Sequence, residues 1–239
     1  MSNLLPLLII FFSVFTQSLA GFGSGLVSMA FLPDILGVRT AVPLVALVTG
    51  SLELLLLIRY RTAFNIKAVW RSILAAILGI PIGLWALRGV SERWLLFILG
   101  VVMTGYALYA LSNLKLPRLE HPAWAYLAGF LSGLLSGAYS VGGPPMIIYG
   151  NCRGWRPDEF KGNLQGIFLV NDSLALLGHA LVGNLTPLVL KSYLFALPAI
   201  GLGIFAGTAL DRVINPLLFR KLILGLLAFM GLRLIWNAF

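Results

Sequence analysis

The chain has 239 residues, of which 59% are hydrophobic and only 10% are charged, and its formal net charge is +9. Apolar stretches of about twenty residues recur along the sequence, which is typical of a protein with several transmembrane helices. This composition excludes a soluble globular protein, because such a protein could not bury so much apolar surface. Basic loops on the cytoplasmic side of a membrane explain the net charge better than nucleic-acid binding does.

The first apolar stretch, LLPLLIIFFSVF, lacks the basic start and the small-residue cleavage site of a signal peptide. We therefore expect it to remain in the mature protein. The expected fold class is an all-α polytopic membrane protein. In chain order, its apolar segments lie near 3–32, 41–58, 69–88, 94–112, 123–150, 164–183, 188–208 and 217–236.

Short motifs of the first half recur in the second half in the same order. Their spacing drifts from 108 to about 125 residues, so the resemblance is weak but ordered. The pairs are GFGSG (21–25) with GFLSG (129–133), LGVR (36–39) with RGWR (153–156), SLELL (51–55) with SLALL (173–177), and LFILGVVMTGYAL (96–108) with LILGLLAFMGLRL (222–234). We predict two transmembrane repeats, 1–113 and 123–239, joined by a connecting loop at 114–122.

The basic residues favour a particular topology for segments 3–32 and 123–150. If both segments are hairpins that enter and leave on one side, twelve of the 17 basic residues face that side, whereas two simple spans give a split of nine to eight. The positive-inside rule therefore favours hairpins. The twelve are Arg59, Arg61, Lys67, Arg71, Lys115, Arg118, Arg153, Arg156, Lys161, Arg212, Arg220 and Lys221.

Segment length supports the same topology. Twenty-eight residues of helix, as in 123–150, reach roughly 42 Å, which suits two half-membrane passes better than one crossing. A broken-helix hairpin followed by three transmembrane helices makes an odd number of crossings. The second repeat would then be inverted relative to the first, an architecture of secondary transporters.

The stretch SVGGPPMIIYG (140–150) must interrupt its helix, because proline lacks an N–H group and glycine weakens the helix. Interrupted backbone is tolerated at membrane depth only where it is buried in protein or lines a water-filled cavity. The N–H groups that open a half-helix can then bind an anion, and a proline fits its first turn. The candidate binding residues at the two interruptions are Gly21, Gly23, Ser24, Gly25, Ser140, Gly142, Gly143, Pro144 and Pro145. The alternative is a kink that only lets helices pack.

Three stretches, GFGSGLVSMAFLPDILGV, GFLSGLLSGAYSVGGPPMIIYG and EFKGNLQGIFLVNDSLALL, resemble the TauE/SafE family, often called the sulfite exporter family. The resemblance covers essentially the whole chain. Its most specific part is GGPP followed by an apolar helix that contains several polar residues. GFGSG is shorter than the glycine cluster of many members. The resemblance implies a transporter of small sulfur-containing or organic anions, such as sulfite or sulfonates, in the bacterial inner (plasma) membrane.

Two acidic residues within apolar segments are candidates for coupling transport to protons, because ionisable groups at membrane depth are costly and usually functional. Glu53 lies close to Arg59 and Arg61, so an interfacial ion pair is an equally good interpretation. Asp172 lies deeper, and burial would favour its protonated form. Protonation would remove the repulsion between Asp172 and a bound anion, which would link proton and anion binding.

Polar residues around Asp172 are further candidates for anion binding. Asn163 and Asn171 are two helical turns apart and, with Asp172, would line the cavity beneath the GGPP interruption. Gln165 is a further member of this face, and Gln17, one turn before GFGSG, is a candidate from the first half. Packing between helices is the alternative role for all of these residues. Ser132, Ser136 and His179 are interpreted as packing residues.

Other classes of protein fit less well. One cysteine and two separated histidines provide no metal motif, and we expect no metal, cofactor, catalytic residue or nucleic-acid partner. An intramembrane serine hydrolase would need G-x-S-G, whereas FGSG, FLSG and LLSG lack the first glycine. A small-ion channel or a transporter of a different substrate stays open as an alternative. The expected partners are a small anion, protons and the lipid bilayer, and a homodimer is compatible with the sequence.

Overall fold

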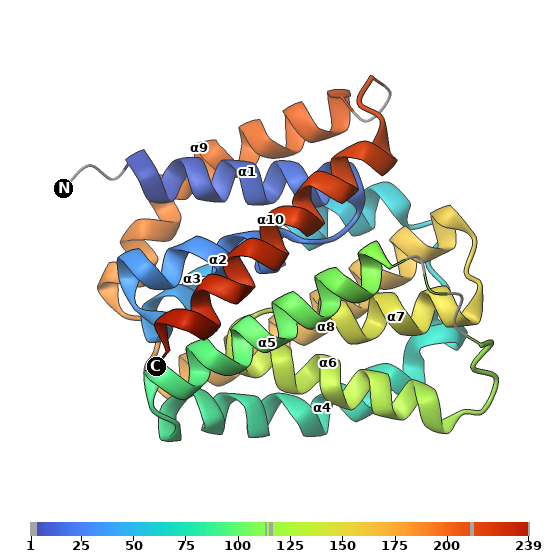
Figure 1. Cartoon of the computed structure of the whole chain (residues 1–239), viewed down its shortest axis with the longest axis horizontal. Coiled ribbons are helices and arrows are strands. Elements are labelled where there is room, and N and C mark those ends of the chain that lie inside the picture. The colour runs from blue at the N-terminus through green and yellow to red at the C-terminus, as the bar shows by residue number, and fades with distance from the viewer. Residues whose placement is uncertain (1–3, 113, 115–116, 211–212, 239) are drawn as a thin grey trace.

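The computed structural model describes residues 4–112, 114, 117–210 and 213–238, and its described parts are helical with short connections. Ten helices are present in this part of the chain (Figure 1). They are α1 (Leu4–Ala20), α2 (Ser24–Leu36), α3 (Val38–Tyr60), α4 (Ile66–Gly89), α5 (Glu92–Leu111), α6 (Ala123–Tyr139), α7 (Gly143–Arg153), α8 (Pro157–Leu181), α9 (Pro187–Leu210) and α10 (Pro216–Asn237). The predicted all-α class is confirmed.

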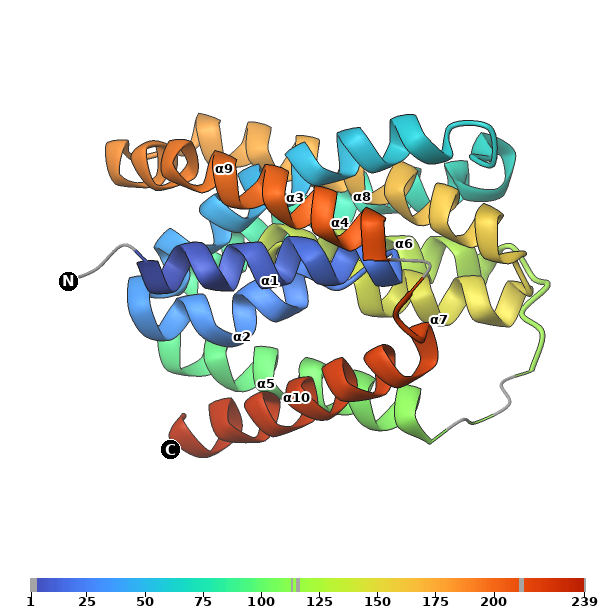
Figure 2. The same ribbon diagram turned by 90° about the horizontal axis from the view of Figure 1, so that it is seen from above.

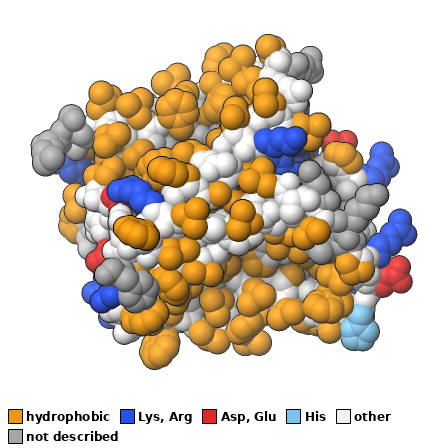
Figure 3. Space-filling model, in the orientation of Figure 1, with side chains coloured by type: hydrophobic (Ala, Val, Ile, Leu, Met, Phe, Trp, Pro, Cys, Tyr) orange, Lys and Arg blue, Asp and Glu red, His pale blue; other side chains and the backbone are white. Residues whose placement is uncertain are grey.

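Five of the described helices are long and apolar enough to cross a membrane: α3, α4, α5, α8 and α9. Helices α1 and α2 are also apolar but shorter. In Figure 3 apolar side chains cover most of the visible face, and most of its charged side chains lie toward the left and right ends. This distribution suits a protein whose flank faces lipid.

Each of the two segments predicted to be hairpins forms two helices. Helix α1 ends at Ala20 and α2 begins at Ser24, whereas α6 ends at Tyr139 and α7 begins at Gly143. Within each pair the chain turns back on itself, and Figures 1 and 2 show that α1 and α6 start from opposite ends of the molecule. The predicted interruptions of both helices are therefore confirmed.

The basic loops gather at one end of the molecule. The connections after α3, α5 and α7 all lie at the right of Figure 1, whereas those after α2, α4 and α8 lie at the left.

Gly37 and Gly154, which end α2 and α7, adopt positive φ angles of 74° and 67°. This conformation costs glycine little and lets the chain turn directly into the next helix.

The helices pair across the two halves of the chain. Helix α6 packs along α4, and α1 packs along α9. The other close pairs join α3 to α8 and α5 to α10. Each hairpin is thus held chiefly by a helix from the other half, and the two interruptions are brought toward the middle of the molecule.

The contact between α4 and α6 corrects one prediction. GFLSG lies in the middle of α6, so it is not the counterpart of GFGSG, which spans the first interruption. A Cβ atom at Gly133 would lie 2.6 Å from the Ala76 Cα atom, and one at Gly137 would lie 3.0 Å from the Leu84 nitrogen. These glycines allow two backbones to approach closely, as small residues do in membrane helices.

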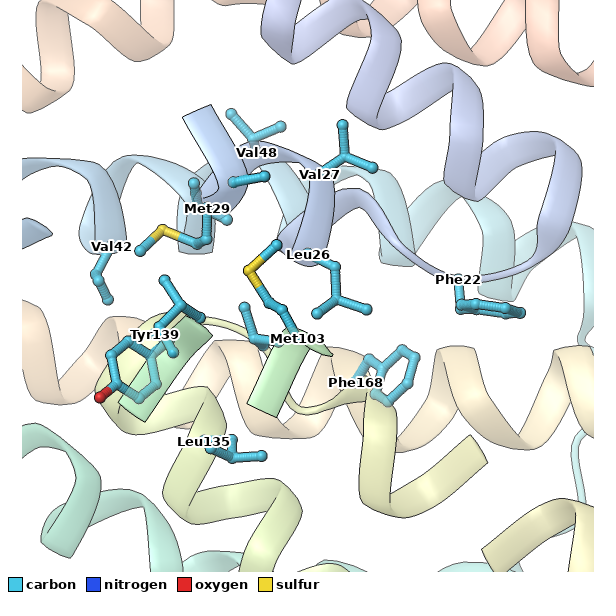
Figure 4. Close-up of a cluster of buried hydrophobic side chains, with 14 of the residues drawn as sticks. Phe22, Leu26, Val27, Met29, Val42, Val48, Met103, Leu135, Tyr139 and Phe168 are labelled. Carbon is cyan, nitrogen blue, oxygen red and sulfur yellow. The ribbon is translucent and has the colours of Figure 1, made fainter. Parts of the chain in front are cut away.

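Apolar side chains surround the two interruptions. Figure 4 shows Leu26, Met29 and Val42 on one side of this cluster and Leu135 and Tyr139 on the other. All five side chains are buried. The dense core leaves little freedom to the backbone at the interruptions and positions the polar groups described next.

Candidate functional site

The two interruptions of the helices are in contact with each other. A Cβ atom at Gly25 would overlap with the Ser140 carbonyl oxygen and would lie 3.7 Å from the Val141 Cα atom. Gly21 and Gly23 have φ angles of 84° and 111°. Glycine is the residue that adopts such angles at little cost, so the GFG sequence is needed for this turn.

Ser140 is the counterpart of these glycines in the second interruption, although it carries a side chain. Its φ angle is 52°, in the left-handed region that non-glycine residues rarely adopt. Its amide donates to the Ser136 carbonyl (2.8 Å), and its hydroxyl donates to the Val42 carbonyl on α3 (3.1 Å). These bonds hold the strained residue in place.

A small buried cavity lies where the two interruptions meet. The centre of a water molecule can occupy about 20 Å³ within it. This is roughly the space that one bound water needs. The cavity is therefore closed to any ligand larger than a water molecule. The lining residues are Gln17, Gly23, Ser24, Gly25, Leu26, Thr49, Glu53, Ser136, Ser140, Val141, Gly142, Gly143, Phe168 and Asp172.

Two side-chain amides hold the first interruption. The Gln17 side-chain oxygen accepts hydrogen bonds from the Ser24 amide (3.1 Å) and from the Ser24 hydroxyl. The Gln17 side-chain nitrogen donates to the Gln165 oxygen (3.2 Å), and Gln165 in turn donates to the Gly21 carbonyl (2.7 Å). Because Gln165 lies on α8, this chain of bonds fastens the first hairpin to the second half.

Glu53 on α3 and Asp172 on α8 face each other across the cavity. Their exposed fractions are only 3% and 4%, and both residues line the cavity. Gln17 lines the same cavity. Glu53 therefore faces the cavity, and the interpretation of it as the ion-pair partner of Arg59 or Arg61 is wrong.

Thr49 is a third polar residue that lies beside the two carboxyl groups. Its hydroxyl contacts both the Asp172 Oδ2 atom and the Val45 carbonyl, the latter at 2.8 Å. A hydroxyl has one hydrogen and cannot donate to both acceptors. A protonated Asp172 would satisfy both contacts, because it would donate to the Thr49 oxygen while Thr49 donates to Val45.

One spacing relates the residues of the two interruptions. Glu53 and Asp172 are 119 residues apart, as are Gly21 and Ser140 and also Gln17 and Ser136. The first residues of α3 and α8, Val38 and Pro157, have the same spacing. The two carboxyl groups therefore lie equally far along two helices that pack against each other.

The structure brings nine of the candidate site residues to the cavity and leaves six outside it. The nine are Gln17, Gly23, Ser24, Gly25, Glu53, Ser140, Gly142, Gly143 and Asp172. The six are Gly21, Pro144, Pro145, Asn163, Gln165 and Asn171. Among the latter, the two prolines line a separate apolar groove between α5, α6 and α7.

Asn163, Asn171 and Asp172 do not share the predicted face. The Asn163 side-chain oxygen accepts a hydrogen bond from the Asn65 amide (2.9 Å), in the connection between α3 and α4. The Asn171 side-chain nitrogen donates to the Ser132 hydroxyl (2.9 Å) on α6. Only Asp172 reaches the cavity, because the helical rotation over eight or nine residues turns Asn163 toward a different neighbour.

Thr49, Ser136 and Phe168 line the cavity but were not predicted as site residues. Thr49 precedes Glu53 by one helical turn, and this i, i+4 spacing was the available signal. Ser136 could not be distinguished by sequence from the packing serines of α6. His179 is buried and pairs with the Asn184 side chain (3.0 Å), so it lies outside this cavity. Among the described residues, no cluster of His, Cys, Asp and Glu could hold a metal ion.

The sequence profile of the sulfite exporter TauE/SafE family matches residues 6–234. The chain belongs to this family. A probable sulfite/organosulfonate exporter TauE of Cupriavidus necator is 27% identical over 235 residues, which cover 93% of this chain and 89% of the relative. A probable inner membrane transporter protein TsaS of Comamonas testosteroni is 29% identical over 171 residues, covering 69% and 72%. No solved structure gives a significant match.

Membership of the TauE/SafE family confirms three predictions made from sequence. The resemblance itself is confirmed over nearly the whole chain. The protein is a multi-pass membrane transporter, and it is not an enzyme.

Proposed function

We propose that this TauE/SafE protein is a proton-coupled secondary transporter of sulfite, organosulfonates or similar small anions, and that it binds the anion between the two helix interruptions. The observation that carries the proposal is the convergence of two helix N-termini, several hydroxyl and amide donors and a pair of carboxyl groups on one buried cavity. The printed name of the Cupriavidus relative supports the class of anion.

Helix α2 supplies most of the backbone donors in this proposal. The first turn of a helix leaves N–H groups without partners inside the helix, and the helix dipole favours an anion there. Ser24, Gly25 and Leu26 of α2 line the cavity. In α7 the residues after Gly143 are Pro144 and Pro145, which have no N–H groups to donate. The Ser24 and Ser140 hydroxyls, which donate to Gln17 and to the Val42 carbonyl in this structure, would have to exchange these acceptors to bind the anion.

The carboxyl pair supplies the link to protons. An anion cannot bind beside two ionised carboxylates that lack a compensating cation, because both the burial and the like charges are unfavourable. Binding therefore requires that the Glu53–Asp172 pair carry at least one proton. Release of the anion on one side then favours release of the proton, which couples the two movements.

Inverted repeats explain how such a site could be opened to each side in turn. In this proposal residues 1–113 form the first repeat, 114–122 the connecting loop and 123–239 the inverted second repeat. The exchange of partners between the halves, α4 with α6 and α1 with α9, supports it, as does the common spacing of 119 residues. Rocking of one hairpin and its partner helix against the other would open the closed cavity.

Transport by protein in liposomes tests the proposal. The wild-type protein should exchange radiolabelled sulfite across the membrane and should accumulate it when a pH gradient is imposed. Asp172→Asn should keep the exchange but lose the accumulation, by tenfold or more, because an amide cannot release a proton. Glu53→Gln should behave similarly, and Glu120→Gln, which alters an exposed loop, is the matched control.

Two results would contradict different parts of the proposal. Accumulation by Asp172→Asn with an unchanged pH dependence would exclude the carboxyl pair from coupling. Absence of wild-type exchange for sulfite, thiosulfate and small sulfonates would exclude this class of substrate. Thermal stability gives an independent check, because an anion at a hundred times its Kd should add about 2.7 kcal/mol to the free energy of unfolding.

A further inference from the structure

A cluster of side chains beside the first interruption, outside the closed cavity, contains hydrogen-bond donors that lack acceptors. Arg220 is in the second turn of α10, and its guanidinium carbon lies 5.5 Å from the centre of the Phe22 ring. The Phe22 ring meets the Tyr106 ring of α5 edge to face, with 6.4 Å between centres. Phe22 is the middle residue of the GFG turn, and Figure 4 shows it set apart from Leu26.

Two polar atoms in this cluster are buried without a hydrogen-bond partner. They are the Arg220 Nε atom and the Tyr106 hydroxyl, and only 4% of Tyr106 is exposed. The guanidinium neighbours the hydroxyls of both Tyr106 and Tyr109. Among the described residues, no carboxylate pairs with Arg220. Arg220 is half-buried, so the cost lies in its buried Nε atom and in the Tyr106 hydroxyl, which both lack a partner. A bound oxyanion could accept a hydrogen bond from each.

The position of the cluster suits a step in anion transit. Arg220 lies toward the end of the molecule that carries the basic loops, as the start of α10 in Figure 1 shows. Phe22 is next to Gly23, which lines the closed cavity. On the other flank of the turn, a Cβ atom at Gly21 would lie 3.1 Å from the Lys161 Cγ atom of α8. Two basic side chains from the second half therefore flank the first interruption.

We propose that Arg220 and Tyr106 form an oxyanion-binding position at the basic-loop end of the first interruption. The transported sulfite or sulfonate group occupies it before or after the closed cavity, and Phe22 separates the two positions. This inference rests on the proposed function. A lipid phosphate group has the same chemistry as the transported anion, so the test must distinguish these two sources.

Four variants test the proposal in liposomes of phosphatidylcholine alone and in liposomes that also contain phosphatidylglycerol. Arg220→Gln removes the cation, Arg220→Lys keeps the charge without the planar fork, and Tyr106→Phe removes only the hydroxyl. Lys221→Gln is the matched control, because Lys221 is exposed on the same turn of α10. The readouts are the KM and turnover for radiolabelled sulfite presented from each side, and the melting temperature with and without sulfite.

The expected result is a KM that rises about tenfold or more for Arg220→Gln on the basic-loop side, with a smaller rise for Tyr106→Phe and Arg220→Lys. A charge-assisted hydrogen bond of ordinary strength accounts for this size of change. The KM from the other side should change little. The melting temperature without sulfite should stay near that of the wild type, because no carboxylate of the described residues pairs with Arg220.

Several results would overturn the proposal. Equal KM values for Arg220→Gln and Lys221→Gln would show that the cluster binds no transported anion. A melting temperature lowered without sulfite, with an unchanged KM, would show a structural role only. An effect of Arg220→Gln confined to liposomes that contain phosphatidylglycerol would identify a lipid phosphate as the ligand and exclude the transit role. A wild-type protein that transports no sulfur oxyanion would instead contradict the proposed function itself.

Discussion

The two helix interruptions reach the same contact by different chemistry. The first turns through Gly21 and Gly23, both with positive φ angles, and is fastened by the amides of Gln17 and Gln165. The second turns through the strained Ser140 and is followed by two prolines. The first interruption thus offers backbone donors, whereas the second offers a stiff surface against which the first can close. In the proposed pair of repeats, the first would supply the donors for the anion and the second would keep the geometry of the site.

The largest expected effect comes from separating the two interruptions. In Gly25→Ala the added Cβ atom would overlap with the Ser140 carbonyl oxygen. Backbone atoms cannot move aside as a flexible side chain can, so the free energy of unfolding should fall by about 1–3 kcal/mol or more. Thermal unfolding measures the loss. Gly201→Ala is the control, because a Cβ atom there would meet nothing within 4 Å and should not destabilise the helix.

An intermediate effect should distinguish the binding roles of the two interruptions. Gln17 and Ser136 are 119 positions apart, as are Glu53 and Asp172, and both line the cavity. Gln17→Ala removes the acceptor for Ser24 and the bond to Gln165, so we expect the Kd for sulfite to rise about tenfold. Ser136→Ala should raise it only a few-fold. Equal losses in the two variants would contradict the difference between the interruptions.

The smallest effect concerns the strain at Ser140. Ser140→Gly relieves the left-handed conformation but removes the hydroxyl bond to Val42, so its stability should stay within about 1 kcal/mol of the wild type. Ser140→Ala keeps the strain and loses the bond. It should therefore be less stable than Ser140→Gly by about 1 kcal/mol, measured by thermal unfolding. An alanine variant as stable as the wild type would show that the hydroxyl bond contributes nothing, and one as stable as Ser140→Gly would show that the strain contributes nothing.

Local patterns predicted most of the fold. Hydropathy located the apolar segments, and the chemistry of glycine and proline located both interruptions, because these signals depend on residues close in sequence. The role of GFLSG in helix packing was not predicted, because glycine suits a tight turn and a close helix contact equally well. Only the neighbouring helix α4 decides between these two roles.

The candidate site was predictable only in part. Glu53 and Asp172 were identified because carboxyl groups are costly in an apolar segment. Their shared place at the cavity, and the bond between Gln17 and Gln165, bring together residues more than a hundred positions apart. Asn163 was assigned to the cavity from helical spacing alone. Its side chain instead accepts a hydrogen bond from the Asn65 amide, in the connection between α3 and α4. Single-sequence patterns contain no information on such tertiary neighbours.

The crossed packing of the hairpins has a consequence for assembly. Hairpin α6–α7 is held by α4 at Gly133 and Gly137, and hairpin α1–α2 is held by α9, where Gly203 and Gly207 approach Val14 and Ser18. Neither half of the chain contains both members of such a pair. A gene divided within the loop 114–122 would therefore encode two fragments, neither of which can bury its own glycine surfaces. Each fragment would complete its folding only with the other present in the membrane.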